Sequence, residues 1–198
     1  MKEHKDSCPI KKFKVLHDLG EPCFSVGYHG QIIYDVCTCG ADKEKEKMIT
    51  KIILKSNVYT SIAETYNCSS KERTEKCGLI PGKIKNKVSH GTEIKWIKNI
   101  ATRGELGCAY NMDPQEMMDV LKHTSIITHE SEKDLSAIVH THPNGEPVPS
   151  LIDIESAKKS GYKTIYIIAG KSPETHSFRI QAYYWNGDTF QEVPITIE

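Results

Sequence analysis

The sequence has no excess of charge of either sign, because its 198 residues contain 26 Lys and Arg and 26 Asp and Glu. Proteins that mainly bind nucleic acid or an anionic membrane usually carry a basic surface or a net positive charge. The balance therefore argues against both as the main partner. With 38% hydrophobic and 26% charged residues, the composition is typical of a globular chain rather than a disordered one.

Long apolar runs are also lacking. No stretch approaches the roughly 20 apolar residues of a membrane-spanning helix. Residues 1–15 are charged throughout and lack the apolar centre of a signal peptide. These absences predict a cytoplasmic protein without a membrane partner. The seven cysteines are then expected to stay as thiols, and an odd number cannot pair completely within one chain.

Composition divides the chain near residue 48. Residues 1–22 are polar and rich in lysine, and alternation over residues 23–36 predicts a hairpin around His29-Gly30. Residues 40–48 are highly charged and are expected to form a linker or the start of a helix. The sequence therefore predicts an N-terminal extension over residues 1–48, with a hairpin, and one domain over residues 49–198.

Helices are mixed among short strands in the second region. Ser56 is expected to cap a helix over residues 57–67, Asp113 to cap one that begins at Pro114, and Ser150 to begin a third that Gly161 ends. The expected strands cover residues 51–55, 77–85, 91–100, 135–140, 163–169, 177–185 and 189–197. This order predicts an α+β fold in which a mixed β-sheet is flanked by helices.

The most informative stretch covers residues 140–153, HTHPNGEPVPSLID. His140 and His142 end a predicted strand two residues apart, so both imidazoles should point to the same side. A proline-rich loop follows, and the first turn of the next helix contains Asp153. If the loop folds back, these side chains supply three zinc ligands and leave a fourth position for water, as in catalytic zinc sites.

Each part of this stretch also has a simpler interpretation. A His-x-His pair at a strand end is more often two half-exposed histidines than a metal pair, and Ser150 with Asp153 matches a capping box. The complete string is harder to explain by structure alone, and a capping serine can also face the site. The other histidines show no ligand spacing, at positions 4, 17, 29, 90, 123, 129 and 176.

The string H-x-H-x7-S-x2-D, formed by His140, His142, Ser150 and Asp153, resembles the signature of the JAMM metallopeptidases, also called the MPN-plus or JAB-domain family. That family also needs an upstream glutamate, which bacterial members commonly carry in a stretch such as E-x-C-G-L. Residues 75–79 are EKCGL and match this stretch. The similarity covers roughly residues 50–198 and leaves the N-terminal region outside it.

The resemblance implies a JAMM/MPN-like fold with a cytidine-deaminase-like architecture, and a set of roles. Zn²⁺ would be held by His140, His142 and Asp153. Glu75 would accept a proton from water and pass it to the departing amine. Ser150 would donate a hydrogen bond to the oxyanion of the tetrahedral intermediate.

Other acidic residues and the cysteines offer alternatives to parts of this assignment. Glu72 and Glu64 are alternatives to Glu75, but the position two before Cys77-Gly78 favours Glu75. Cys77 is expected to be a small core side chain rather than a nucleophile. Four N-terminal cysteines could form a structural zinc site, but their spacing fits no common zinc module, which favours free thiols: Cys8, Cys23, Cys37 and Cys39.

The resemblance implies a zinc-dependent isopeptidase or peptidase that hydrolyses the amide bond after the C-terminal tail of a ubiquitin-like or sulfur-carrier protein. The site is expected to lie in a groove beside the strand that ends at His140, where an extended tail can pair with a strand edge. One alternative is a RadC-like protein linked to DNA repair, against which the neutral charge and the EKCGL stretch argue. The other is an MPN scaffold that only binds partners, and such domains usually lack the metal ligands that are all present here.

Overall fold

The computed structural model describes residues 25–26, 32–33, 48–102, 107–127 and 131–198. The chain forms two compact units, Met1–Lys47 and Met48–Glu198. In the first unit, β1 (Ser25–Val26) and β2 (Ile32–Ile33) pair in antiparallel fashion, which confirms the predicted hairpin. The four N-terminal cysteines, and the predicted linker apart from its last residue, lie outside the described residues.

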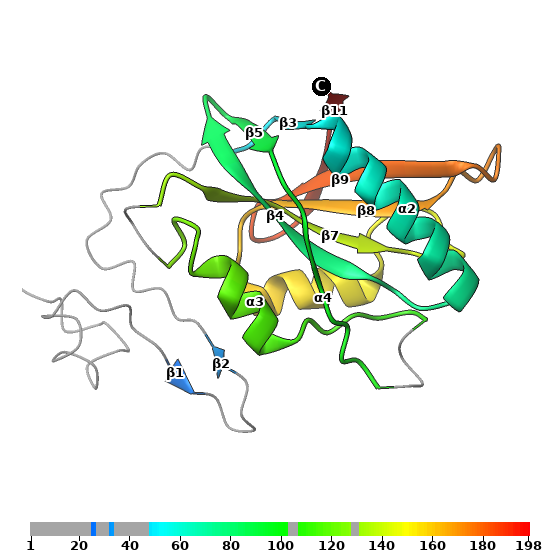
Figure 1. Ribbon diagram of the computed structural model, residues 1–198, viewed down its shortest axis with the longest axis horizontal. Helices are drawn as coiled ribbons and strands as arrows, with labels where there is room; N and C mark the ends of the chain where they lie inside the picture. The colour runs from blue at the N-terminus through cyan, green and yellow to red at the C-terminus, as the bar shows by residue number, and fades with distance from the viewer. Residues whose placement is uncertain (1–24, 27–31, 34–47, 103–106, 128–130) are drawn as a thin grey trace, which may run out of the picture. The chain divides into compact units, whose positions relative to one another are not determined.

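A nine-stranded mixed sheet forms the framework of the second unit (Figure 1). Its strands are β3 (Lys51–Leu54), β4 (Cys77–Lys85), β5 (Val88–Gly91), β6 (Lys95–Ile97), β7 (Asp134–Thr141), β8 (Ile165–Lys171), β9 (Phe178–Trp185), β10 (Phe190–Val193) and β11 (Ile195–Ile197). They follow the order β10-β9-β8-β7-β4-β5-β3-β11, and β6 pairs with β4. Strand β7 runs antiparallel to β4 and parallel to β8, so the mixed sheet of the prediction is confirmed.

Helices cover both faces of this sheet. Figure 1 shows α2 (Ser56–Glu72) on one side and α3 (Pro114–Leu121) and α4 (Leu151–Ser160) on the other. The helices therefore flank the sheet, as the α+β fold requires. Among the described residues, no helix is both long and apolar enough to cross a membrane.

Strand β7 divides its side chains between the two faces by simple alternation. Ala137 and Val139 belong to the apolar cluster that contains the buried face of α2. Ile138 belongs to the second cluster, which α3 and α4 cover. Continuing the series, His140 points to the α3 and α4 side, whereas Thr141 points to the α2 side. The sheet thus separates two neighbouring residues into two environments.

Two predicted helix starts are confirmed and one is wrong. The Asp113 side chain accepts hydrogen bonds at the start of α3, and Ser150 forms a capping box at the start of α4, which Gly161 ends. At α2 the N-cap is Lys55, without a side-chain hydrogen bond. The Ser56 hydroxyl instead donates to the Glu198 carbonyl at 2.7 Å, which ties α2 to the end of the chain. This helix also continues beyond the predicted end at residue 67.

Two predicted strands are interrupted. The expected strand over residues 91–100 is replaced by β5, which ends at Gly91, and by the short β6. The expected strand over residues 189–197 is broken at Pro194, which has no N–H for a ladder hydrogen bond. The part before the proline pairs with β9, and the part after it pairs with β3 at the far side of the sheet. An apolar pattern alone does not reveal such a change of partner.

Candidate metal centre and active site

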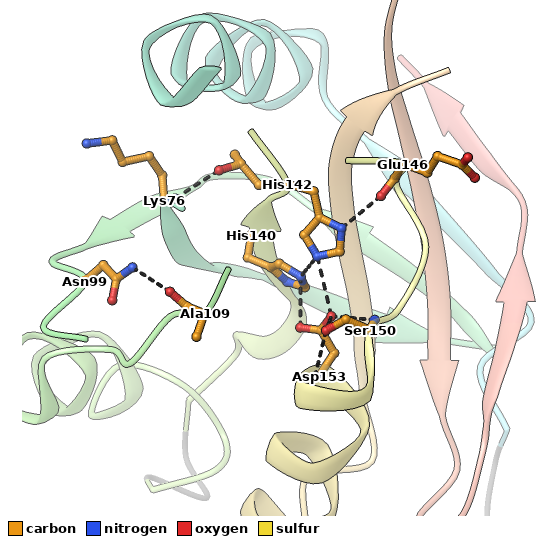
Figure 2. Close-up of polar contacts among 9 residues, drawn as sticks. Lys76, Asn99, Ala109, His140, His142, Glu146, Ser150 and Asp153 are labelled. Atoms are coloured by element: carbon orange, nitrogen blue, oxygen red, sulfur yellow. Dashed lines mark hydrogen bonds and ion pairs between the residues drawn. The ribbon is translucent and has the colours of Figure 1, made fainter. Parts of the chain in front are cut away.

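The three predicted metal ligands meet at the carboxyl end of β7 (Figure 2). His140 is the second-last residue of β7, His142 follows the strand, and Asp153 lies in the first turn of α4. The two histidine Nε2 atoms are 3.0 Å apart. The Asp153 carboxylate lies 3.0 Å from His140 Nε2 and 3.4 Å from His142 Nε2. One ligand atom from each side chain lies within 4.8 Å of the others.

The capping box of α4 brings Asp153 to this position. The backbone N–H of Ser150 donates to Asp153 Oδ2 at 2.7 Å, and the N–H of Asp153 donates to Ser150 Oγ at 3.2 Å. The Ser150 hydroxyl also donates to Asp153 Oδ2 at 2.6 Å. The same contacts that cap α4 therefore orient the Asp153 carboxylate toward the two histidines.

The proline-rich loop between His142 and Ser150 packs directly on β8 and β9. Lys171 N–H donates to the Gly145 carbonyl at 2.8 Å, and the Tyr183 hydroxyl donates to the Pro147 carbonyl at 3.1 Å. A Cβ atom at Gly170 would lie 2.6 Å from the Gly145 oxygen, so only glycine allows this close approach. The loop is thus fixed by the sheet before any ligand binds.

Burial and the neighbouring charges have opposite effects on the pKa values of the three candidate ligands. Burial alone would raise the pKa of Asp153, but attraction to His140 and hydrogen bonds from both histidines and Ser150 hold that pKa well below its usual range. Burial lowers the pKa of His140. Burial also acts to lower the pKa of His142, but its hydrogen bonds to Asp153 and Glu146 outweigh this and raise it. The carboxylate is therefore ionised beside a buried, neutral imidazole.

These residues fit a bound cation. His142 Nδ1 lies 2.8 Å from the Glu146 carbonyl, which only accepts, so a ring proton is assigned to Nδ1 and Nε2 is the nitrogen that faces the site (Figure 2). In the metal-free protein a proton on His142 Nε2 donates to Asp153, and a bound cation would take the place of that proton. Ligand distances of about 2.0–2.2 Å in a tetrahedral zinc site place the ligand atoms about 3.3 Å apart. The two Nε2 atoms are 3.0 Å apart, and each lies 3.0 to 3.4 Å from a different oxygen of the Asp153 carboxylate, which is close to this spacing.

Glu75 lies in the connection between α2 and β4 and is only 5% exposed. Burial raises its pKa to about 7, with the field of His142 opposing the rise and that of Asp153 adding to it. A carboxyl group with a pKa near neutrality is suited to accept a proton and return it. The alternative acids, Glu72 and Glu64, are both exposed, so the structure favours Glu75 among the three.

Sequence reasoning missed the side chain that packs on the first histidine. The Tyr110 ring stacks on the His140 ring, with centroids 4.7 Å apart and an angle of 29° between the planes. Within the described part of the chain, His140 Nδ1 is buried and has no hydrogen-bond partner. The stacked tyrosine therefore helps to hold the ring where a hydrogen bond does not. The path of the loop brings Tyr110 there, and no local pattern signals it.

Two further expectations are settled by neighbouring contacts. Cys77 is fully buried, and burial raises the pKa of its thiol to about 12, which agrees with a core side chain rather than a nucleophile. A substrate tail cannot pair with an edge of β7, because β4 occupies one edge and β8 the other up to Thr141. If a tail pairs with a strand edge beside the site, that edge must therefore belong to another strand.

Comparison with known proteins relates the chain to a protein family, to a curated relative and to a solved structure. The Prok-JAB family, described as prokaryotic homologs of the JAB domain, matches residues 58–181, a range that contains the three candidate ligands, Glu75 and Ser150. A desampylase from Haloferax volcanii is 31% identical over 124 residues, which cover 63% of this chain and 78% of the relative. A solution structure of a protein from Desulfitobacterium hafniense has a TM-score of 0.56 at 18% identity and covers 74% of this chain and 92% of that one, which is a likeness of fold.

Proposed function

This chain belongs to the family of prokaryotic homologs of the JAB domain, and on that premise we propose that it is a zinc-dependent isopeptidase. Its substrate would be an amide bond directly after the C-terminal tail of a ubiquitin-like or sulfur-carrier protein. The desampylase from Haloferax volcanii supports this reaction class. The observation that carries the proposal is the convergence of His140, His142 and Asp153 beside a buried Glu75 whose pKa is raised to about 7.

The chain's own residues divide the reaction between them. A zinc ion held by His140, His142 and Asp153 would supply a Lewis acid that polarises the carbonyl and lowers the pKa of water. Water oxygen attacks the carbonyl carbon, and Glu75 accepts the proton that the water releases. When the carbon–nitrogen bond breaks, Glu75 passes this proton to the departing amine. The products are the free tail carboxylate and the amine of the former conjugate.

Ser150 is the proposed donor to the oxyanion, and for this its hydroxyl must first leave the hydrogen bond that it makes to Asp153. Its hydroxyl donates to Asp153 Oδ2 at 2.6 Å, so the single proton is already engaged. To stabilise developing charge on the substrate oxygen, the hydroxyl must rotate away from the carboxylate. The backbone N–H of Ser150 continues to hold Asp153 during this rotation, because it makes a separate hydrogen bond at 2.7 Å.

Strand β6 is the open edge on which an extended tail would dock. In the described part of the chain it pairs only with β4, in a register that sets Ile97 opposite Cys77. On its other side Cys77 is opposite His140. A tail added to β6 would therefore be separated from β7 by β6 and β4, and main-chain hydrogen bonds would hold it.

The test uses a candidate carrier fused through its tail to a reporter protein. Purified, zinc-loaded protein is incubated with the fusion, and the products are identified by mass. We expect one cut, directly after the tail. As a control, the same carrier is fused through its N-terminus, which leaves the junction outside a tail. Cleavage only at internal sites of unfolded proteins would identify a general peptidase instead, and zinc binding without any cleavage would favour a scaffold.

A further inference from the structure

The residue between the two histidines, Thr141, belongs to a buried hydrogen-bond relay on the opposite face of the sheet. Its side chain is fully buried, as is that of Ser69 near the end of α2. Thr141 Oγ1 and Ser69 Oγ are 2.6 Å apart. Thr141 Oγ1 also accepts the backbone N–H of Lys76 at 2.9 Å, and the Ser69 hydroxyl donates to the Thr74 carbonyl at 2.6 Å.

Only one direction of protons satisfies all three hydrogen bonds. The Thr74 carbonyl can only accept, so Ser69 must use its single proton there. Ser69 Oγ then accepts from the Thr141 hydroxyl, which leaves Thr141 Oγ1 free to accept from Lys76. Each hydroxyl donates once and accepts once. A buried network whose members are all satisfied is rigid, whereas a partly satisfied one is costly.

The two ends of the relay enclose Glu75. The Thr74 carbonyl belongs to the peptide group before Glu75, and the Lys76 N–H belongs to the peptide group after it. Holding both peptide groups fixes the backbone torsions of the residue between them. The Glu75 carbonyl itself accepts from Asn99 Nδ2 at 3.0 Å, and the Lys76 carbonyl accepts from Thr141 N–H at 3.0 Å.

We propose that Thr141 and Ser69 are positioning residues that hold the backbone of Glu75 in register with the histidines of β7. This inference rests on the proposed function, in which Glu75 carries the proton. Strand β7 provides His140 on one face and Thr141 on the other, and it leads directly into His142, so one element positions both histidines and the backbone of the proton carrier. The relay needs no contact with substrate or metal to do this.

The experiment compares Thr141→Val with Thr141→Ser, which keeps the hydroxyl. In Thr141→Val, we expect kcat on the tail fusion to fall about 10- to 100-fold with little change in KM, as a misplaced catalytic group would produce. Thr141→Ser should restore kcat, and both variants should bind zinc as the wild type does. Ser136→Ala is the matched control, since it removes another fully buried hydroxyl from β7, one that donates to the His90 carbonyl at 3.0 Å.

A second measurement does not depend on activity. In metal-free protein, hydrogen exchange at the Lys76 amide should be about tenfold faster or more in Thr141→Val, because that amide loses its partner, and should stay slow in Thr141→Ser. If Thr141→Val does not fold, Ser69→Ala, which removes the donor to Thr74 and the acceptor of the Thr141 hydroxyl, serves for the kcat and zinc measurements. Unchanged kcat, loss of zinc in Thr141→Val, or unchanged Lys76 exchange would each overturn the proposal. If the wild type cleaves no tail fusion, the proposed function fails, and Lys76 exchange alone then decides whether the relay holds this segment.

Discussion

Replacing Glu75 with Gln should stabilise the metal-free protein at pH 8. Burial raises the pKa of Glu75 from 4.5 to about 7, so the folded protein binds this proton more tightly than the unfolded chain. The stabilising contribution of the proton is therefore fully present below pH 4.5 and is lost as the pH rises through about 7. At pH 8 the folded state holds an ionised, buried carboxylate, which glutamine would replace with a neutral group of the same shape.

The magnitude follows from the same interval. The pKa of Glu75 rises from 4.5 to about 7, and each pH unit corresponds to about 1.4 kcal/mol. Ionising Glu75 in the folded protein therefore costs about 3 kcal/mol of stability. Glu75 is 5% exposed, so solvent screens this cost little. We expect Glu75→Gln to raise the free energy of unfolding by up to about 3 kcal/mol at pH 8, and to leave it nearly unchanged at pH 4.5.

The assay is urea denaturation of both proteins with a chelator present, at the two pH values. Glu72→Gln is the matched control: Glu72 is exposed, and a hydrogen bond from Lys76 lowers its pKa, so this change should not stabilise the protein at pH 8. The reasoning would be refuted if Glu75→Gln were no more stable than the wild type at pH 8, or if its free energy of unfolding rose equally at both pH values.

Three further outcomes follow from the site. The purified protein should carry about one zinc per chain by elemental analysis, and His142→Ala should lose it; full occupancy in a His140→Ala, His142→Ala double variant would place the metal elsewhere. Gly170→Ala should push the proline-rich loop away, because its Cβ would lie 2.6 Å from the Gly145 oxygen; we expect about 1–3 kcal/mol lower stability in denaturation and weaker zinc binding, and unchanged values would contradict the described packing. Ser150→Ala should cost about 1 kcal/mol through the lost cap and also lower kcat; a loss of stability without a loss of kcat would leave Ser150 as a cap alone.

The sequence could predict those parts of the fold and site that depend on local spacing. His140 and His142 share a face because strand side chains alternate, and Asp153 reaches them because Ser150 begins a helix three residues earlier. The fold class was predictable for the same reason, since helical and strand periods are local. The upstream glutamate needed the resemblance in addition, because Glu75 lies in a charged run in which nothing local sets it apart.

The parts that were missed depend on contacts between distant segments. Ser56 lost its predicted capping role because its hydroxyl reaches the Glu198 carbonyl. Tyr110 stacks on His140 because of the path of its loop, and Thr141 holds Lys76 across the sheet. Pro194 separates two strands whose partners lie on different parts of the sheet. Tertiary packing decides each of these, and a single sequence contains no spacing that reports it.

The central claim is that Glu75 carries the proton in a reaction at the His140, His142 and Asp153 centre. The most direct test measures zinc content and tail-fusion cleavage together in wild type and Glu75→Gln, with Glu72→Gln as the control. The account predicts equal zinc content in all three, an active Glu72→Gln variant, and at least an approximately 100-fold loss of kcat in Glu75→Gln. A Glu75→Gln variant that retains zinc and cleaves as fast as the wild type would contradict the account.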